Sequence, residues 1–206
     1  MDLQKFLVLF ATFVILSIPL AFVTKNSEQE KVLSLRNSNL MQLKKKNKCP
    51  NCDLSSLNMK GLDLSRSELE GAYLNRANLN KVDLVGANLA GVYLSDADLS
   101  AANMRGVNLS EAELDRANLT LANLAEANLT GAILNGANLG KANMSNADLT
   151  RASLVGVNLN KTNLTSANLT GVSLISVNLK NANLTRVDFA GIDMEGANLV
   201  GANLTG

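Results

Sequence analysis

Residues 117–136 read ANLTL-ANLAE-ANLTG-AILNG, four units of five residues that each carry leucine at the third position. Counting in fives from Leu54 to Leu204 places a large apolar residue at all 31 positions: 26 Leu, four Met and one Phe. The residue two before it is mostly Ala or Val, and the residue between them is mostly Asn or Asp. A period of five fits neither an amphipathic helix nor an alternating strand. Self-similarity at a fixed period indicates a solenoid instead.

Each five-residue unit is predicted to form one short side of a coil. Because side chains alternate along an extended segment, the Leu and the small residue two before it point inward and the Asn or Asp points outward. Residues 20 positions apart should share an environment if four units close a coil. One outward column contains no Asn and reads Asp53, Tyr73, Tyr93, Glu113, Ile133, Ser153, Ser173, Asp193. The next column, from Asn58 to Asn198, holds only Asn and one Asp.

Glycine recurs at the fifth position of the unit at one corner of this coil, as Gly71, Gly91, Gly131, Gly171 and Gly191. A corner that needs a positive φ favours glycine. The glycine spacing therefore supports a four-sided coil of 20 residues independently of the leucine count.

The intact unit Ala167–Asn168–Leu169–Thr170–Gly171 resembles the repeat of the pentapeptide-repeat family. The resemblance covers residues 52–206 and implies an all-β solenoid, a right-handed quadrilateral β-helix. At 20 residues a coil, these 155 residues make 155/20, or about 7–8 coils, and a rod of roughly 37 Å at the strand spacing. The resemblance implies no biochemical activity, because the residues of the motif build the core.

An apolar run, Phe6–Val23, precedes the repeats. Its 18 residues are at the lower limit for a membrane span and longer than the apolar region of most signal peptides. Residues 1–24 are therefore predicted to be a transmembrane anchor or a cleaved signal peptide, and no Ala-x-Ala cleavage site distinguishes the two. Export would place Lys25, Lys31 and Arg36 on the non-cytoplasmic side of the membrane, whereas basic residues beside a membrane span usually stay on the cytoplasmic side. The predicted location is membrane-anchored or exported, to a periplasm or lumen-like compartment.

Residues 25–51 form a basic segment with seven Lys and Arg and two Glu. Ser27–Lys46 is predicted to be a helix, since Ser27 and Glu30 make a capping box and Val32, Leu33, Leu40 and Leu43 give an apolar stripe. This helix would cover the open end of the first coil, as solenoids require. The lysines from Lys44 to Lys48 would also suit anionic lipid headgroups.

Cys49 and Cys52 are the only cysteines in the chain. The C-x-x-C just before the first repeat resembles that of exported or lumenal bacterial family members, and the resemblance implies a disulfide that clamps the junction with the cap. Two free thiols are the alternative. Zinc binding is disfavoured because the chain has no His and no second cysteine pair. A redox protein that uses Cys49 and Cys52 is an alternative function, but thioredoxin-like chemistry would need a helix start in an α/β setting, whereas this pair leads into a β coil.

The sequence predicts a protein without catalytic residues, metal or cofactor. With no His, nucleophilic triads are excluded, and Glu111, Glu113 and Asp115 read as a solvated corner. The leading function is a structural or protein-interaction module whose partner face carries Tyr73, Tyr93 and Ile133. An end-to-end homodimer through the C-terminal coil is a further candidate.

Some pentapeptide-repeat proteins protect DNA gyrase by resembling a duplex, and DNA mimicry is therefore the alternative function. The repeats carry 15 acidic and 11 basic residues, a net charge of −4. A duplex of about 37 Å carries roughly 22 negative charges. Lys81, Lys141 and Lys161 also align on one side of the coil. These charges disfavour both mimicry and nucleic-acid binding.

Overall fold

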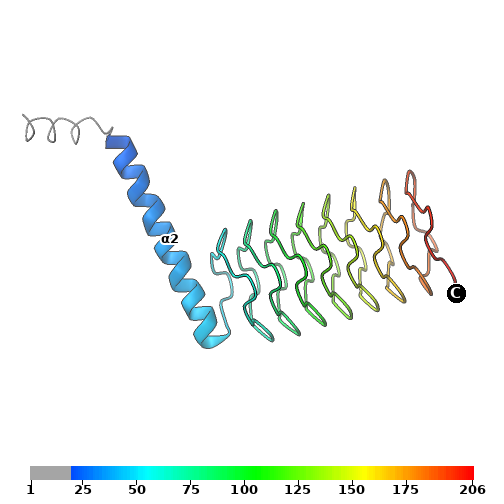
Figure 1. Ribbon diagram of the computed structural model, residues 1–206, viewed down its shortest axis with the longest axis horizontal. Helices are drawn as coiled ribbons and strands as arrows, with labels where there is room; N and C mark the ends of the chain where they lie inside the picture. The colour runs from blue at the N-terminus through cyan, green and yellow to red at the C-terminus, as the bar shows by residue number, and fades with distance from the viewer. Residues whose placement is uncertain (1–19) are drawn as a thin grey trace, which may run out of the picture.

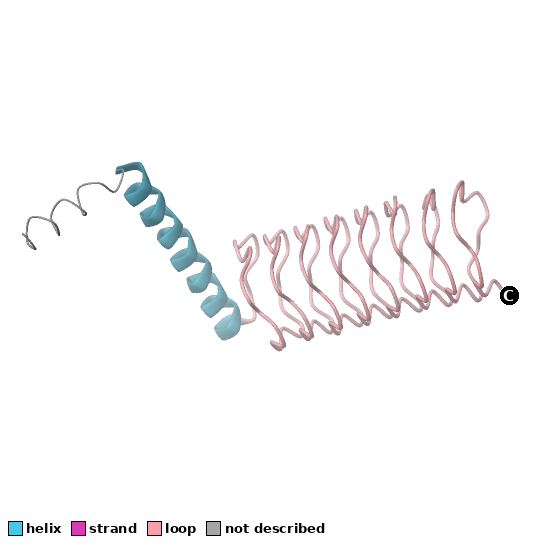
Figure 2. Ribbon diagram, turned by 45° about the horizontal axis from the view of Figure 1, so that its top comes forward, coloured by secondary structure: helices cyan, strands magenta, loops and turns pink. Residues whose placement is uncertain are grey.

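The structure is a computed structural model that describes residues 20–206. Helix α2 (Leu20–Lys46) is followed by a rod of stacked coils that runs to the C-terminus (Figure 1). The rod contains turns and extended residues but no continuous strand in the described chain (Figure 2). Each side of a coil contributes a single bridged residue, because only three extended residues separate one turn from the next.

Parallel β-bridges join residues 20 positions apart throughout the rod, from Lys48–Glu68 to Asn183–Asn203. Four such columns run along the rod, one on each side of the coil. Backbone hydrogen bonds link successive coils; for example, the Leu124 N–H donates to Asn143 O at 2.6 Å. The predicted period of 20 residues is the one observed. The ladder begins at Lys48, slightly upstream of Cys52, where the sequence repeat begins.

A tight turn forms each corner, and the residue two positions after the central Leu has a positive φ at every corner from Asn51 to Gly201. Glycine fills only part of these positions. Lys81 and Arg151, for example, adopt φ of 58° without being glycine. A hydrogen bond closes the turn. The backbone N–H of the residue three positions after the central Leu donates to the Leu carbonyl, as Ala77 N does to Leu74 O at 3.0 Å. This is the backbone pattern of a type II turn.

The core is a dry column of side chains inside the coils. The central Leu and Met residues from Leu54 to Leu184 are buried, with at most 2% of their surface exposed. The Ala and Val residues two before them line the same interior. Thr162 replaces one of these small residues, and its buried hydroxyl donates to Leu139 O at 2.7 Å.

Helix α2 lies across the N-terminal end of the rod (Figure 1). Leu43 is fully buried against the first coil and Leu40 is half-buried, but Val32 and Leu33 are exposed. Only the second half of the expected stripe therefore packs on the rod. The prediction that Ser27 begins the helix was wrong, since α2 already includes Leu20 and runs through Ser27 without interruption.

The predicted membrane or signal segment, Phe6–Val23, lies almost entirely outside the described residues. Among residues 20–206, no helix offers an apolar stretch long enough to cross a bilayer.

The last coil, residues 187–206, is looser than the others. The bridges that would join Asn168 to Asp188 and Ser173 to Asp193 are absent from the described ladder. Phe189 occupies a position that Leu fills elsewhere in its column, and its larger ring coincides with this opening. Phe189, Ile192 and Met194 are only partly buried, and Leu204 is 50% exposed. The described chain therefore presents an open apolar end.

Candidate functional site

Asparagine ladders occupy three of the four sides of the rod. On these sides, most Asn residues from Asn103 onward donate from Nδ2 to the Oδ1 of the residue 20 positions earlier, as Asn143 does to Asn123 at 3.3 Å. The same Oδ1 accepts a backbone N–H two residues later, as from Ala125 to Asn123. Most outward amides of these three sides are therefore engaged within the chain, and we call these sides the asparagine faces.

The fourth side carries the column from Asp53 to Asp193 that contains no Asn, and we call it the tyrosine face. The rings of Tyr73 and Tyr93 stack with centroids 4.8 Å apart and an interplanar angle of 4°. Tyr73 is 43% exposed and Ile133 37% exposed. The structure thus places the three predicted partner residues, Tyr73, Tyr93 and Ile133, on one face.

Two further exposed apolar residues border the tyrosine face. Val155 is 53% exposed and Ile175 is 37% exposed, at the first turn position after the face. Sequence reasoning missed them because it followed only the outward strand position. The signal was present in the neighbouring column, where polar residues at Asn75, Ser95, Asp115 and Asn135 give way to Val155 and Ile175.

Charged side chains border the middle of the tyrosine face. Arg116 donates from Nε and Nη2 to the Asp96 carboxylate at 2.8 and 2.9 Å. The hydrogen bond from Arg116 lowers the pKa of Asp96 below its ordinary value; burial opposes this shift, and the charges of Arg116 and Arg76 add to it. Glu111 is exposed at the corner on the opposite edge of the face. These groups are solvated and paired, so they lack the convergent, buried arrangement of an acid–base site.

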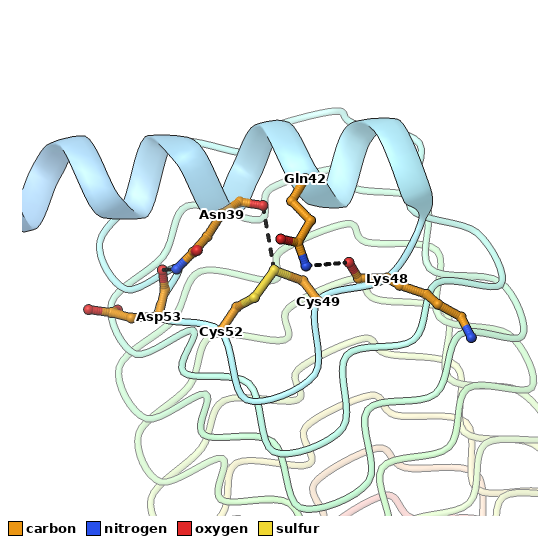
Figure 3. Close-up of a disulfide and its surroundings, with 6 residues drawn as sticks. All are labelled: Asn39, Gln42, Lys48, Cys49, Cys52 and Asp53. Atoms are coloured by element: carbon orange, nitrogen blue, oxygen red, sulfur yellow. Dashed lines mark hydrogen bonds between the residues drawn. A yellow bond between two sulfur atoms is a disulfide. The ribbon is translucent and has the colours of Figure 1, made fainter.

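Helix α2 reaches the tyrosine face at Asp53. Arg36 Nε donates to Asp53 Oδ2 at 2.8 Å, and Asn39 Nδ2 donates to Asp53 O at 3.0 Å. Burial alone would raise the pKa of Asp53, but hydrogen bonds from Arg36 and Ser55 outweigh it, and the pKa lies below its ordinary value. Figure 3 shows that α2 continues beyond Asp53. The helix therefore extends past the edge of the first coil on the side of the tyrosine face.

A disulfide joins Cys49 and Cys52 beneath α2 (Figure 3). Proline and asparagine at positions two and three favour a type II turn. Asn51 accordingly has a φ of 55°, and the turn brings the two Cα atoms to 5.4 Å. Cys49 is buried and its Sγ contacts Asn39 O at 3.5 Å. The pair occupies the first corner of the rod, where the helix meets it.

Five lysines line the corner diagonally opposite the one between Cys49 and Cys52. All five are exposed: Lys60, Lys81, Lys141, Lys161 and Lys180. No acidic residue stands at the two turn positions of this corner. The predicted alignment of Lys81, Lys141 and Lys161 is therefore part of a longer basic edge.

Within residues 20–206, no three His, Cys, Asp or Glu side chains converge in a way that could hold a metal ion.

The family model for pentapeptide repeats matches eight copies in this chain, over residues 67–106, 102–140, 122–160, 142–181 and 173–206. The chain belongs to the pentapeptide-repeat family. Pentapeptide-repeat proteins are generally structural modules without enzymatic activity. The family assignment confirms the resemblance seen in the sequence and supports the solenoid fold.

Solved pentapeptide-repeat structures match most of the rod. HetL, involved in heterocyst differentiation regulation in the cyanobacterium Nostoc sp. strain PCC 7120, is 28% identical over 77% of this chain and 85% of its own, with a TM-score of 0.28. A protein of the Arabidopsis thaliana thylakoid lumen is 26% identical over 69% of each chain, with a TM-score of 0.25.

A trypsin-treated form of QnrB1, a plasmid-mediated fluoroquinolone resistance protein, is 21% identical over 73% of this chain and 79% of its own, with a TM-score of 0.38. The comparison with curated proteins found no match.

Proposed function

We propose that this pentapeptide-repeat protein is a non-catalytic interaction module whose tyrosine face binds a protein partner. Its scaffold is a right-handed four-sided β-helix of about 7–8 coils, closed at its N-terminal end by α2. The observation that carries the proposal is the contrast between the faces. Three faces engage most of their outward amides in ladders, whereas the tyrosine face exposes Tyr73 and Ile133, and the turn beside it exposes Val155 and Ile175. Exposed aromatic residues are enriched where proteins bind one another.

We also propose that residues 1–24 anchor the chain in a membrane or direct its export. The apolar run Phe6–Val23 and the C-x-x-C pair, which suits an oxidising compartment, support this location. Helix α2 would then connect the membrane to the rod. Protease accessibility of the repeats in intact and permeabilised cells tests the side of the membrane, and membrane fractionation tests the anchor.

The open last coil is a second candidate surface, through which two copies could associate. Its support is the partial exposure of Phe189, Ile192 and Met194 in the described chain.

Affinity capture with the double variant Tyr73→Asn, Tyr93→Asn tests the partner face. We expect the variant to lose partners that the wild-type chain retains, because the replaced rings supply the main apolar area of the first half of the face. The matched control is Leu121→Asn, which removes a residue 58% exposed at the lysine corner. An unchanged set of partners in the double variant would refute binding through this face.

A further inference from the structure

Helix α2 carries an uncovered continuation of the surface that covers its own rod. Leu43, Leu40, Asn39 and Arg36 face the first coil, and Arg36 pairs with Asp53 at the edge of the tyrosine face. Residues spaced three to four apart share one side of a helix. The same side therefore continues into a shallow hollow lined by Glu28, Gln29, Val32, Leu33 and Arg36. Val32 and Leu33 are 44% and 53% exposed.

At the other end of the rod, the described residues place no helix over the last coil. The last described coil exposes part of Phe189, Ile192 and Met194. These residues point inward, as do the residues of the first coil that α2 covers. The same chain thus contains a helix surface that covers the first coil and a last described coil whose inward residues are partly exposed.

We propose that two copies of this chain pair antiparallel through their tyrosine faces, with α2 of each copy covering the last coil of the other. This inference rests on the proposed binding role of the tyrosine face and names its partner as a second copy. For α2 to meet the partner's last coil, the first coil of one copy must lie beside the last coil of the other. That requirement sets the register of the two faces.

In this register, the two tyrosines of one face meet serines of the other. Tyr73 lies opposite Ser173, Tyr93 opposite Ser153 and Glu113 opposite Ile133. Val155 and Ile175 stand beside the two serines at the turn, where they can pack against the tyrosine rings. The apolar residues of the C-terminal half thus meet the aromatic residues of the N-terminal half.

The corners that border the face match in the same way. Gly91 lies opposite Arg151 and Gly156 opposite Asp96, and the space beside each glycine is open, with no atom within 4 Å of an added Cβ. In each pair one residue has no side chain, so the bulky corner residue of one copy enters the space that glycine leaves on the other. The register was set by α2 alone, and the residue sizes agree with it independently.

At each end of the paired face, Arg36 can neutralise the two carboxylates that come together. Asp193 of the second copy comes opposite Asp53, beside the Arg36 guanidinium. Arg36 uses its Nε for Asp53, and a guanidinium has five N–H donors in all. Arg36 can therefore serve both carboxylates.

The twofold axis of this pair directs the two α2 helices to opposite sides. Two copies anchored in one bilayer cannot pair in this way. The paired copies are those released by cleavage of the N-terminal segment or held in two facing membranes.

Light scattering of the full-length chain in mild detergent, corrected for bound detergent, measures the pairing over a range of concentrations. Gly91→Arg introduces a side chain where the native corner has open space, with no atom within 4 Å of the added Cβ. Its φ of +61° is one that Arg186 also adopts. We expect the variant to raise the dimer dissociation constant at least about tenfold, because two arginines then meet.

Gly106→Arg is the matched control. Gly106 has a φ of +64° and equally open space, but its corner lies between two asparagine faces. We expect it to keep the wild-type dissociation constant. The swapped double variant, Gly91→Arg with Arg151→Gly, should restore pairing, because each copy again places glycine opposite arginine. A Gly91→Arg chain that pairs like the wild type overturns the proposal, as does failure of the swap to rescue a folded chain.

The α2 contact is tested separately with Val32→Glu, which should weaken pairing. Met41→Glu, on the other side of the helix and 73% exposed, should not. A monomeric wild-type chain would refute the pairing, yet capture of another protein through Tyr73 and Tyr93 would then still support the proposed function. Pairing that survives in Gly91→Arg but is lost when residues 187–206 are removed would show end-to-end contact instead and overturn the arrangement.

Discussion

The central residue of each five-residue unit from Leu54 to Leu184 is buried in a column closed to solvent. Each buried Leu contributes about 1.5–3 kcal/mol of transfer free energy, most of which the loss of chain entropy offsets. A charge placed in this column has no partner and no solvent. The residues at the corners, in contrast, are solvated and tolerate many side chains.

Leu124→Asp should therefore prevent folding, because Leu124 is fully buried in mid-rod. Leu121→Asp is the control in the same coil, since Leu121 is 58% exposed and its φ of 63° suits Asp. Circular dichroism during heating distinguishes them. A cooperative β-sheet melting transition in Leu124→Asp would contradict this account of the core.

Asn123→Ala should lower the free energy of unfolding by about 1–3 kcal/mol, because it removes bonds to Asn103, Ala125 and Asn143. Ser173→Ala, on the tyrosine face, is the control, since its buried hydroxyl has no partner in the described chain. Denaturant unfolding of both variants measures the difference. An equal effect of the two substitutions would mean that the ladders do not stabilise the rod.

At the scale of elements, the coil was predictable and the helix boundary was not. A repeat without insertion fixes which residues are inside, so the 20-residue period and the side without Asn follow from the sequence. The start of α2 does not, because Ser27 and Glu30 make a capping pattern that a longer helix runs through. The exposure of Val155 and Ile175 also depends on where the turns point, which the strand alternation does not describe.

The contact of α2 with Asp53 should weaken in acid. The folded pKa of Asp53 is lowered, so its contribution to stability is present above the unfolded pKa of about 3.9 and is lost as pH falls through the folded value. Hydrogen exchange of the second half of α2, followed from neutral pH to below about pH 4, should show this loss of protection. Asp53→Asn should remove most of the pH dependence, and an unchanged profile would assign it to other carboxylates.

Reduction of the Cys49–Cys52 disulfide should destabilise the N-terminal end of the rod more than its middle. The loop it closes is short, so the expected effect is about 2 kcal/mol. Coils interact mainly with their neighbours, and the effect should therefore remain local. Hydrogen exchange with and without reductant compares the first coil with the coil that contains Leu124. Uniform loss of protection along the rod would contradict local coupling.

At the scale of the molecule, the rod has one basic edge and no continuous acidic surface. The repeats carry a net charge of −4, and five lysines follow one corner. We therefore expect no protection of a type II topoisomerase in a supercoiling assay, because a duplex of this length carries roughly 22 negative charges. Protection at low micromolar protein would contradict this expectation, and Lys141→Glu with Lys161→Glu would then be expected to strengthen it.

The crosswise placement of α2 determines how the rod would sit relative to a bilayer that holds the N-terminal segment. From Thr24 to Arg36 the helix rises about 18 Å. Such a bilayer would face the long flank of the rod rather than its tip. This separation would keep Tyr73 and Tyr93 clear of the lipid headgroups. The space between the tyrosine face and the membrane would be deep enough for a folded protein layer parallel to the membrane.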